Sequence, residues 1–245
     1  MIWVTGDTHG DWVHRLNMDS FPEQKEMSKD DYVIICGDFG LWSDSPQQRW
    51  NLKWLEERNF TTLFVDGNHS NFDMLDSYPV SEWHGGKVHF INPSVIHLMR
   101  GQIFNIEEKI FFTFGGAASH DIQDGILEID DPRISQWRKD PDKMYRINHV
   151  SWWEREMPNE EEMDEGRENL ELVGNKVDFI ITHCVASSTQ AIMSQGFYKP
   201  DELTNYLEDI RRCIAYKYWL FGHYHDNKNI TPKDICLYDQ IVRIN

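Results

Sequence analysis

Short apolar runs recur along the chain, and a cluster of polar residues follows several of them. The runs cover residues 2–5, 32–36, 63–65, 110–114, 179–182 and 218–221. Near-continuous apolar runs of this length are typical of strands that are buried on both faces. The pattern therefore predicts a sheet core covered on both sides by other elements.

Helical patterns lie between these runs, at residues 46–58, 159–174 and 201–214. Asn159 and Glu162 have the spacing of a capping box, and Asp201 is placed to cap the third helix. Residues 83–106 are rich in β-branched and turn residues and predict hairpins, while residues 235–244 predict one or two strands. Strands and helices thus alternate along the chain, which indicates an α/β fold.

No internal repeat, low-complexity linker or hinge interrupts the sequence, so we expect a single domain over residues 1–245. An irregular insert at about residues 117–158 breaks the pattern and is a candidate lid. A surface excursion pinned by its tryptophans is the alternative interpretation, and both stay open. We expect Trp152 and Trp153 to pack the insert onto the body, and the acidic run 154–168 to be a solvated helix face.

Polar side chains that can bind metal ions follow the apolar runs. They are Asp7 and His9, Asp38, Asn68 and His69, His183, and finally His223 and His225. Such groups converge at the carboxyl ends of strands in an α/β sheet, and they suit hard or borderline metals. Each block alone has an ordinary explanation as a turn, a helix cap or a core histidine. The last pair is the strongest signal, because two histidines at i and i+2 after a buried strand are costly unless something binds them.

Composition narrows the range of partners. Lys+Arg is 24 and Asp+Glu is 41, which gives a net charge of −17 and argues against nucleic acid and anionic membranes as partners. No apolar run approaches the ~20 residues that span a bilayer, and residues 1–10 do not read as a secretion signal. The four cysteines are far apart and form no C-x-x-C pattern. We therefore expect a cytoplasmic protein.

The ordered set of polar blocks is more specific than its members. Asp-x-His at 7–9 is followed by Gly-Asp at 37–38, Gly-Asn-His at 67–69, a lone His at 183 and Gly-His-x-His at 222–225. In this order the blocks resemble the calcineurin-like metallophosphoesterase superfamily, over most of the chain. The resemblance implies a four-layer αββα sandwich, in which two mixed β-sheets pack face to face and are flanked by helices.

The resemblance also implies a role for each matched residue. One metal ion would be held by Asp7, His9, Asp38 and His225, and the other by Asp38, Asn68, His183 and His223. Asp38 would bridge the two ions. His69 would bind no metal; as a catalytic residue beside the substrate phosphate, it would steady the transition state or protonate the leaving oxygen.

Two divalent ions roughly 3.5–4 Å apart can share a carboxylate and a hydroxide, and this bridging hydroxide is a strong nucleophile at neutral pH. The ions would bring about +4 against about −2 from Asp7 and Asp38, so an acidic chain can still bind an anionic substrate. Mixed nitrogen and oxygen ligands suit Mn, Fe, Zn, Ni or Co, and the resemblance favours Mn or Fe.

Departures from the family pattern bear on the function. Ser70 stands where relatives usually carry Asp or Glu, which affects the support of the site rather than its ligands. Residues 37–42 lack the Asp-Arg-Gly of the protein Ser/Thr phosphatase branch, although the opening Gly-Asp-x-His-Gly is similar to it. After the run at 110–114, Ser119 and Asp121 stay open as pocket residues, and we expect His120 to be structural.

We therefore predict a dinuclear metal-dependent phosphoesterase, which hydrolyses a phosphomonoester or phosphodiester by attack of the bridging hydroxide. The acidic composition favours a small or soluble phosphoester over duplex nucleic acid. One alternative is a non-catalytic binding or scaffold protein on the same fold, which the presence of His69 and Asp38 disfavours. The other is a protein Ser/Thr phosphatase, which would need a phosphate-binding arginine from the insert.

Overall fold

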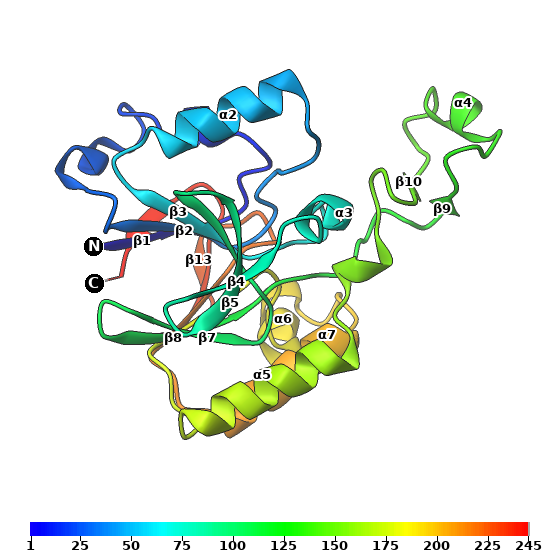
Figure 1. The fold of residues 1–245 in the computed structure, drawn as a ribbon. Helices are drawn as coiled ribbons and strands as arrows, with labels where there is room; N and C mark the ends of the chain where they lie inside the picture. Colours follow the sequence, from blue (N-terminus) through cyan, green and yellow to red (C-terminus); the bar gives the residue numbers. More distant parts are fainter. Residues whose placement is uncertain (245) are drawn as a thin grey trace.

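Two mixed β-sheets form the centre of the molecule in a computed structural model that describes residues 1–244 (Figure 1). The first sheet has the order β15-β1-β2-β3-β6-β5-β4, and the second has the order β13-β14-β12-β11-β8-β7. The first sheet contains β1 (Ile2–Thr5), β2 (Tyr32–Ile35), β3 (Thr61–Phe64), β4 (Val80–Trp83), β5 (Gly86–Asn92), β6 (Val95–Leu98) and β15 (Ile241–Arg243). The second contains β7 (Gln102–Ile106), β8 (Lys109–Phe114), β11 (Phe179–Thr182), β12 (Tyr218–Phe221), β13 (Lys228–Asn229) and β14 (Asp234–Cys236).

The inner strands of both sheets are parallel. In the first sheet these are β1, β2, β3 and β6, and in the second they are β8, β11, β12 and β14. The other strands pair antiparallel. Among them, the pairs β4–β5 and β5–β6 are hairpins in the region predicted to form them, residues 83–106, and β7 in the same region pairs with β8 beyond it. Parallel inner strands need cover on both faces, which explains their near-continuous apolar sequences.

Each central strand contributes to two apolar layers. Ile34 of β2 and Ile181 of β11 pack in the layer between the sheets. Val33 and Ile35 of the same β2 point outward, into the layer beneath the helices of the first sheet. Trp219 of β12 plays the corresponding outward role in the second sheet. Successive side chains point to opposite faces of a strand, so both faces of these strands are buried.

Helices cover the outer faces of both sheets. Against the first sheet lie α1 (Trp12–Arg15), the 3₁₀ turn η1 (Pro22–Glu26), α2 (Pro46–Glu56) and α3 (Phe72–Leu75). Against the second sheet lie α5 (Glu160–Leu172), α6 (Ser187–Ser194) and α7 (Glu202–Cys213) (Figure 1). The capping box of Asn159 and Glu162 is present, and Asp201 caps α7. The predicted αββα sandwich is therefore confirmed.

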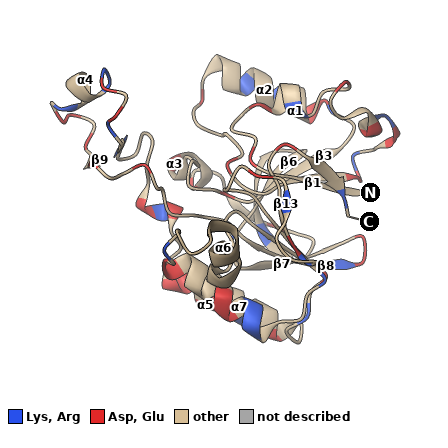
Figure 2. Ribbon diagram, turned by 180° about the vertical axis from the view of Figure 1, so that it is seen from behind, with Lys and Arg blue, Asp and Glu red and all other residues tan. Residues whose placement is uncertain are grey.

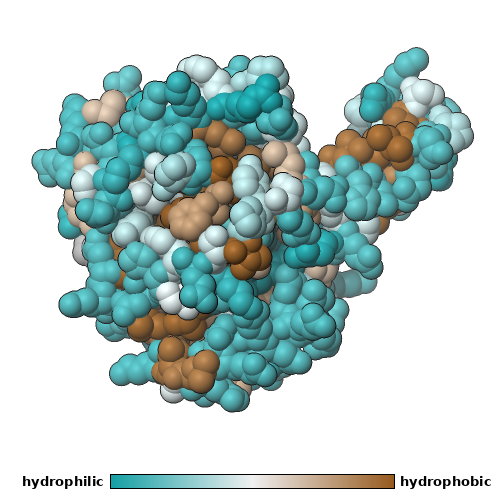
Figure 3. All heavy atoms as spheres, in the orientation of Figure 1, coloured by the Kyte–Doolittle hydropathy of each residue, from teal (hydrophilic) through white to brown (hydrophobic). Residues whose placement is uncertain are grey.

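The insert departs from this layered body. It leaves after β8 and contains β9 (Gly125–Leu127), α4 (Ile134–Trp137) and β10 (Tyr145–Ile147), before the turn η2 (Glu154–Glu156) returns to α5. We call residues 119–153 the arm, and Figure 1 shows it projecting away from both sheets. Leu127, Ile134 and Ile147 form a small core of its own, and Figure 3 shows further apolar atoms along its surface.

The arm is fastened to the body through α3. Asp73 of α3 accepts a hydrogen bond from Trp153 Nε1 (2.8 Å) and pairs with His149 Nδ1 (2.9 Å). Trp153 is buried among the residues of the first helical layer, so it packs the insert onto the body as predicted. A role of the insert as a lid stays a prediction. Asp and Glu residues are frequent along α5, as Figure 2 shows. No helix within residues 1–244 is long and apolar enough to cross a membrane.

Candidate metal centre

Five of the predicted site residues follow the ends of parallel strands. Asp7 follows β1, Asp38 follows β2 and Asn68 follows β3, all in the first sheet, while His183 and His223 follow β11 and β12 in the second. Because the two sheets pack face to face, these strand ends meet at one edge of the sandwich. Residues separated by more than 200 positions in the sequence are thereby brought into contact.

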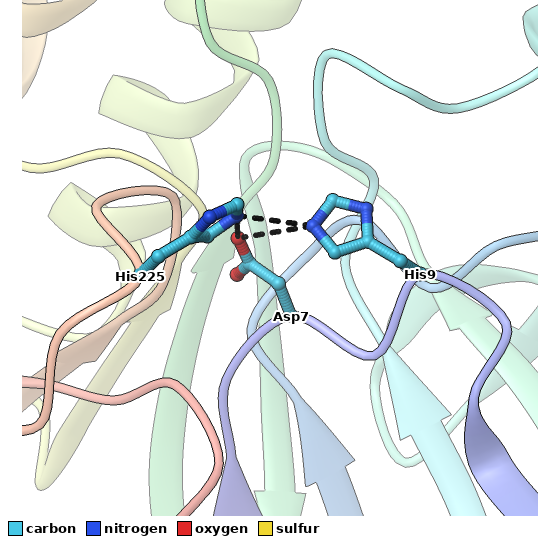
Figure 4. A group of neighbouring side chains, drawn as sticks. All are labelled: Asp7, His9 and His225. Carbon is cyan, nitrogen blue, oxygen red and sulfur yellow. Dashed lines mark hydrogen bonds and ion pairs between the residues drawn. The ribbon is translucent and has the colours of Figure 1, made fainter.

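The first cluster of ligand atoms joins Asp7, His9 and His225 (Figure 4). His225 Nε2 lies 3.2 Å and His9 Nε2 3.9 Å from Asp7 Oδ2. The two Nε2 atoms are 3.0 Å apart. Figure 4 shows both rings pointing at the same carboxylate, so three ligand atoms face one small space.

The second cluster joins Asp7, Asp38 and His183, all of them buried. His183 Nδ1 lies 2.9 Å from the carbonyl oxygen of Cys36, which makes Nδ1 the protonated nitrogen. Its Nε2 lies 3.1 Å from Asn68 Oδ1 and 3.4 Å from Asp38 Oδ2. This Nε2, an amide oxygen and a carboxylate oxygen therefore lie together as candidate ligands.

The remaining predicted residues border these clusters. The backbone N–H of His69 donates to Asp38 Oδ1 (2.9 Å), and the His69 ring centroid lies 5.7 Å from that of His9. The backbone N–H of His223 donates to Asp7 Oδ1 (2.9 Å). The His223 ring lies against His183, with 4.9 Å between centroids, but its Nε2 is turned to His120 Nε2 at 3.3 Å. His120, expected to be structural, thus lies at the edge of the site.

The backbone at the site is strained. His9, Asp38, His223 and His225 all have left-handed backbone conformations, with φ values of 45°, 40°, 67° and 49°. Each such conformation costs on the order of 1–3 kcal/mol in a non-glycine residue and persists where the surroundings impose it. Strain of this kind concentrates at functional sites, and here it is found in three loops, which follow β1, β2 and β12.

Glycines beside the ligands allow the loops to approach so closely. A Cβ on Gly222 would lie 2.0 Å from Asp7 Oδ1, and a Cβ on Gly67 would lie 2.2 Å from Asp38 Oδ1. Any side chain at either position would displace a predicted ligand. The glycines of Gly-His-x-His and Gly-Asn-His therefore serve the packing of the site itself.

The charges of the site favour a cation. Asp7 and Asp38 are 1% and 2% exposed, yet their ion-pair partners within residues 1–244 are histidines, with no Lys or Arg among them. Burial would raise the pKa of Asp38, but nearby histidines, His183 above all, hold it below its usual range. Burial lowers the pKa of His183, and Asp38 and Asp7 outweigh this and raise it to about 9. Two buried carboxylates surrounded by histidine nitrogens fit divalent metal ions well, because a metal ion can take the place of the proton that they hold on His183.

A cavity of about 350 Å³ opens beside the ligands. Its walls come from the body (His9, Trp42 and His69) and from the insert (Arg146, Val150, Ser151 and Trp153). Trp42 Nε1 donates to the carbonyl oxygen of His69 (3.1 Å). Burial lowers the pKa of His69; the charge of Asp38 opposes this, and the charge of Arg146 adds to the lowering. The insert thus brings a cation to the predicted catalytic residue.

The sequence did not predict several side chains that surround the candidate ligands. Arg146 is held by Asp121 through Nε (2.9 Å) and Nη2, which gives Asp121 a role at the rim of the site. Glu156 is 3% exposed and bonded to Ser119, so the prediction of a solvated face for residues 154–168 is wrong at Glu156. Ser70 Oγ accepts a hydrogen bond from Gly67 N (2.9 Å) and closes the loop that carries Asn68. No local sequence pattern distinguishes Arg146 or Glu156 from neighbouring charged residues.

The fold and the site together define a class, the two-sheet α/β sandwiches that bring aspartate and histidine side chains together at the ends of their parallel strands. A model of the calcineurin-like phosphoesterases matches residues 1–227, and the chain belongs to this family. The resemblance seen in the sequence is therefore confirmed.

Among solved structures, the chain is similar to phosphopantetheinyl hydrolase (PptH) from Mycobacterium tuberculosis. The two share 14% sequence identity with a TM-score of 0.43, over 97% of this chain and 89% of that chain. No curated protein matches the chain.

Proposed function

We propose that the chain is a dinuclear metal-dependent phosphoesterase that hydrolyses a phosphomonoester or a phosphodiester. The observation that carries this proposal is the burial of Asp7 and Asp38 among histidine nitrogens, without a Lys or Arg partner in residues 1–244. Asp7, His9, Asp38 and His225 would hold one ion. Asp38, Asn68, His183 and His223 would hold the other, with manganese or iron the metals that we expect.

Bound divalent ions would activate water and neutralise the charge that develops on the phosphate. The protein's own residues orient this chemistry. Asp38 would belong to both ligand sets, and its Oδ1 accepts the backbone N–H of His69 (2.9 Å). That bond fixes the position of His69 relative to the ligands. His69 would then hold the proton that the leaving oxygen requires.

The low pKa of His69 is compatible with this role. Burial and Arg146 lower the pKa of its ring, so the ring is mainly neutral at neutral pH before substrate binds. An anionic phosphate beside the ring would raise its pKa and favour the protonated form. His69 would therefore take up a proton when substrate binds and could donate it to the leaving oxygen.

A protein Ser/Thr phosphatase is the second candidate, and one observation favours it. That function needs a phosphate-binding arginine from the insert, and Arg146 lines the cavity beside His69. Arg146 uses Nε and Nη2 to bind Asp121, and within residues 1–244 its Nη1 makes no hydrogen bond. Nη1 is therefore free to donate to a phosphate oxygen.

The first test compares p-nitrophenyl phosphate with bis-p-nitrophenyl phosphate, after removal of metal by chelation and reloading with Mn²⁺. Metal-restored cleavage of either compound is the expected result, and the better substrate separates monoesterase from diesterase chemistry. A protein that binds Mn²⁺ and cleaves neither compound nor any phosphopeptide would favour the non-catalytic alternative instead.

The second test separates the two catalytic candidates. The variant Arg146→Ala is assayed on p-nitrophenyl phosphate and on a phosphoserine peptide, with Arg133→Ala as the matched control. Arg133 lies in the same arm but pairs with Asp131, outside the residues that line the cavity. A protein phosphatase would cleave the peptide efficiently and lose roughly 10-fold in kcat/KM when Arg146 is removed, as expected for a hydrogen bond to a charged group.

A further inference from the structure

Asn68, the predicted amide ligand, is linked by hydrogen bonds to a buried carboxylate. Its Nδ2 donates to Ser119 Oγ (3.3 Å), and Ser119 Oγ donates to Glu156 Oε2 (2.7 Å). The backbone N–H of Ser119 donates to Glu156 Oε1 (2.7 Å). All three side chains are buried, so water competes little for these bonds. Ser119 is the first residue of the arm, and Glu156 lies just after the last. The two ends of the arm therefore meet beside Asn68.

The chemistry of these groups gives the chain of bonds a direction. An ionised carboxylate only accepts hydrogen bonds, so the single hydroxyl proton of Ser119 points to Glu156. Only lone pairs of Ser119 Oγ remain for Asn68, which must present its amide N–H group to them. Asn68 Oδ1 consequently faces the opposite way, where it lies 3.1 Å from His183 Nε2. A reversed amide would set two oxygens against each other and turn N–H groups toward the metal site.

The body holds Glu156 in place from its backbone side. Arg100 Nη2 donates to the carbonyl oxygens of Arg155 (2.8 Å) and Glu156 (3.3 Å). The same Arg100 is bound to the buried carboxylate of Asp66 through Nε (3.0 Å) and Nη2 (2.6 Å). Glu156 therefore belongs to the rigid part of the fold and can impose a fixed orientation on Ser119.

We propose that Ser119 and Glu156 are positioning residues that hold Asn68 Oδ1 toward one of the two metal ions. The inference rests on the proposed function, because it takes Asn68 to be a ligand. The partners that orient metal ligands typically change metal affinity 10–100-fold when they are lost. Loss of this pair should weaken the one ion that Asn68 binds and spare the other.

The test is a competition titration of the metal-free protein with Mn²⁺ against a chelator, which measures both metal affinities. Glu156→Gln keeps the size of the side chain but introduces a donor, so the hydroxyl of Ser119 is free to turn and the amide of Asn68 to reverse. Ser119→Ala removes the hydroxyl, whereas Ser119→Thr retains it and should restore wild-type binding. Glu208→Gln is the matched control, because Glu208 is a buried carboxylate that holds Ser188 through its N–H and its Oγ and belongs to neither ligand cluster.

We expect two Mn²⁺ ions in the wild type, and one affinity lowered 10–100-fold in Glu156→Gln and Ser119→Ala. The other affinity should stay unchanged in both variants, and both affinities should stay unchanged in Ser119→Thr and Glu208→Gln. Wild-type affinities in Glu156→Gln and Ser119→Ala would overturn the inference and leave the proposed function intact. Equal weakening of both ions, in step with a lower melting temperature of the metal-free protein, would also overturn it. A wild type that binds no Mn²⁺ would overturn the proposed function as well.

Discussion

Buried carboxylates follow neighbouring strands of the first sheet, and their charges are balanced in two different ways. Asp66, after β3, accepts hydrogen bonds from Arg100 Nε (3.0 Å) and Nη2 (2.6 Å), with His97 Nε2 at 3.2 Å. Asp7 and Asp38, after β1 and β2, are as deeply buried, but histidines are their ion-pair partners within residues 1–244. An arginine completes a permanent structural ion pair, whereas a histidine can give up its proton and leave the negative charge of the carboxylate to a metal ion.

The pKa values express the same contrast. Burial would raise the pKa of Asp66, but Arg100 and then His97 hold it well below its usual range. Asp38 is stabilised mainly by His183, whose own pKa is raised to about 9 by Asp38 and Asp7 against the effect of burial. A metal ion can take the place of a proton on His183, but no ligand can take the place of Arg100. The partners of these buried acids therefore separate Asp66, which completes a structural ion pair, from Asp38, the predicted metal ligand.

The largest effect should follow from Asp38→Asn. Asparagine tolerates the φ of 40° at this position and keeps the size of the side chain, so the metal-free protein should fold. The variant lacks the shared negative charge, and we expect loss of bound Mn²⁺ and of at least ~10³-fold in turnover. Metal analysis after gel filtration measures the first, and an assay with p-nitrophenyl phosphate the second. Unchanged metal content would refute the bridging role of Asp38.

The matched change at the structural acid is Asp66→Asn. It leaves Arg100 buried with Glu162 as its remaining carboxylate partner, at 3.2 Å. Breaking a buried ion pair costs about 3–5 kcal/mol, and we expect the lower end of this range because Glu162 compensates in part. Urea unfolding of the metal-free protein measures the loss, and a Mn²⁺ titration should give wild-type stoichiometry. A variant with normal stability and lost metal would erase the contrast between the two kinds of acid.

His69→Ala tests the residue that borders the ligands without belonging to either cluster. Removal of a general acid typically costs ~10²-fold or more in turnover, and metal content should not change because the backbone N–H that donates to Asp38 remains. The comparison of kcat for p-nitrophenyl phosphate with that for an alkyl phosphate sharpens the result. An alkoxide needs a proton more than nitrophenolate does, so the alkyl ester should lose more. Full activity on both esters would exclude a catalytic role for His69.

The sequence predicts the layered body well, because doubly buried strands carry unbroken apolar runs and helices carry capping residues such as Asn159. It also predicts the residues that converge at the strand ends, since parallel strands end at one edge of a sheet. The small elements of the arm escape prediction, because a core of Leu127, Ile134 and Ile147 is too sparse to produce a periodic pattern. The burial of Glu156 escapes prediction too, because it depends on Ser119, which lies 37 positions away in the sequence.

The smallest effect concerns pH, and it tests whether the Asp66 network is separate from the metal centre. His89 Nδ1 lies 3.2 Å from His97 Nδ1, and His97 Nε2 faces Asp66. Burial, and then the neighbouring His97, lower the pKa of His89 to about 4. An unfolded histidine titrates near pH 6.5, so the folded state binds fewer protons between about pH 6.5 and 4. This stabilisation is complete above pH 6.5 and is lost as the pH falls toward 4.

His89→Gln should therefore flatten the dependence of stability on pH in this window, by on the order of 1–2 kcal/mol at pH 4 relative to pH 7. Urea unfolding at half-unit pH steps measures the slope, and the exposed His14→Gln is the control that should leave it unchanged. The decisive comparison is between metal-free and Mn²⁺-loaded protein. If arginine has completed the charge balance of Asp66, the contribution of His89 is the same in both forms. A contribution that appears only with bound metal would show that the two kinds of buried acid act as one coupled network.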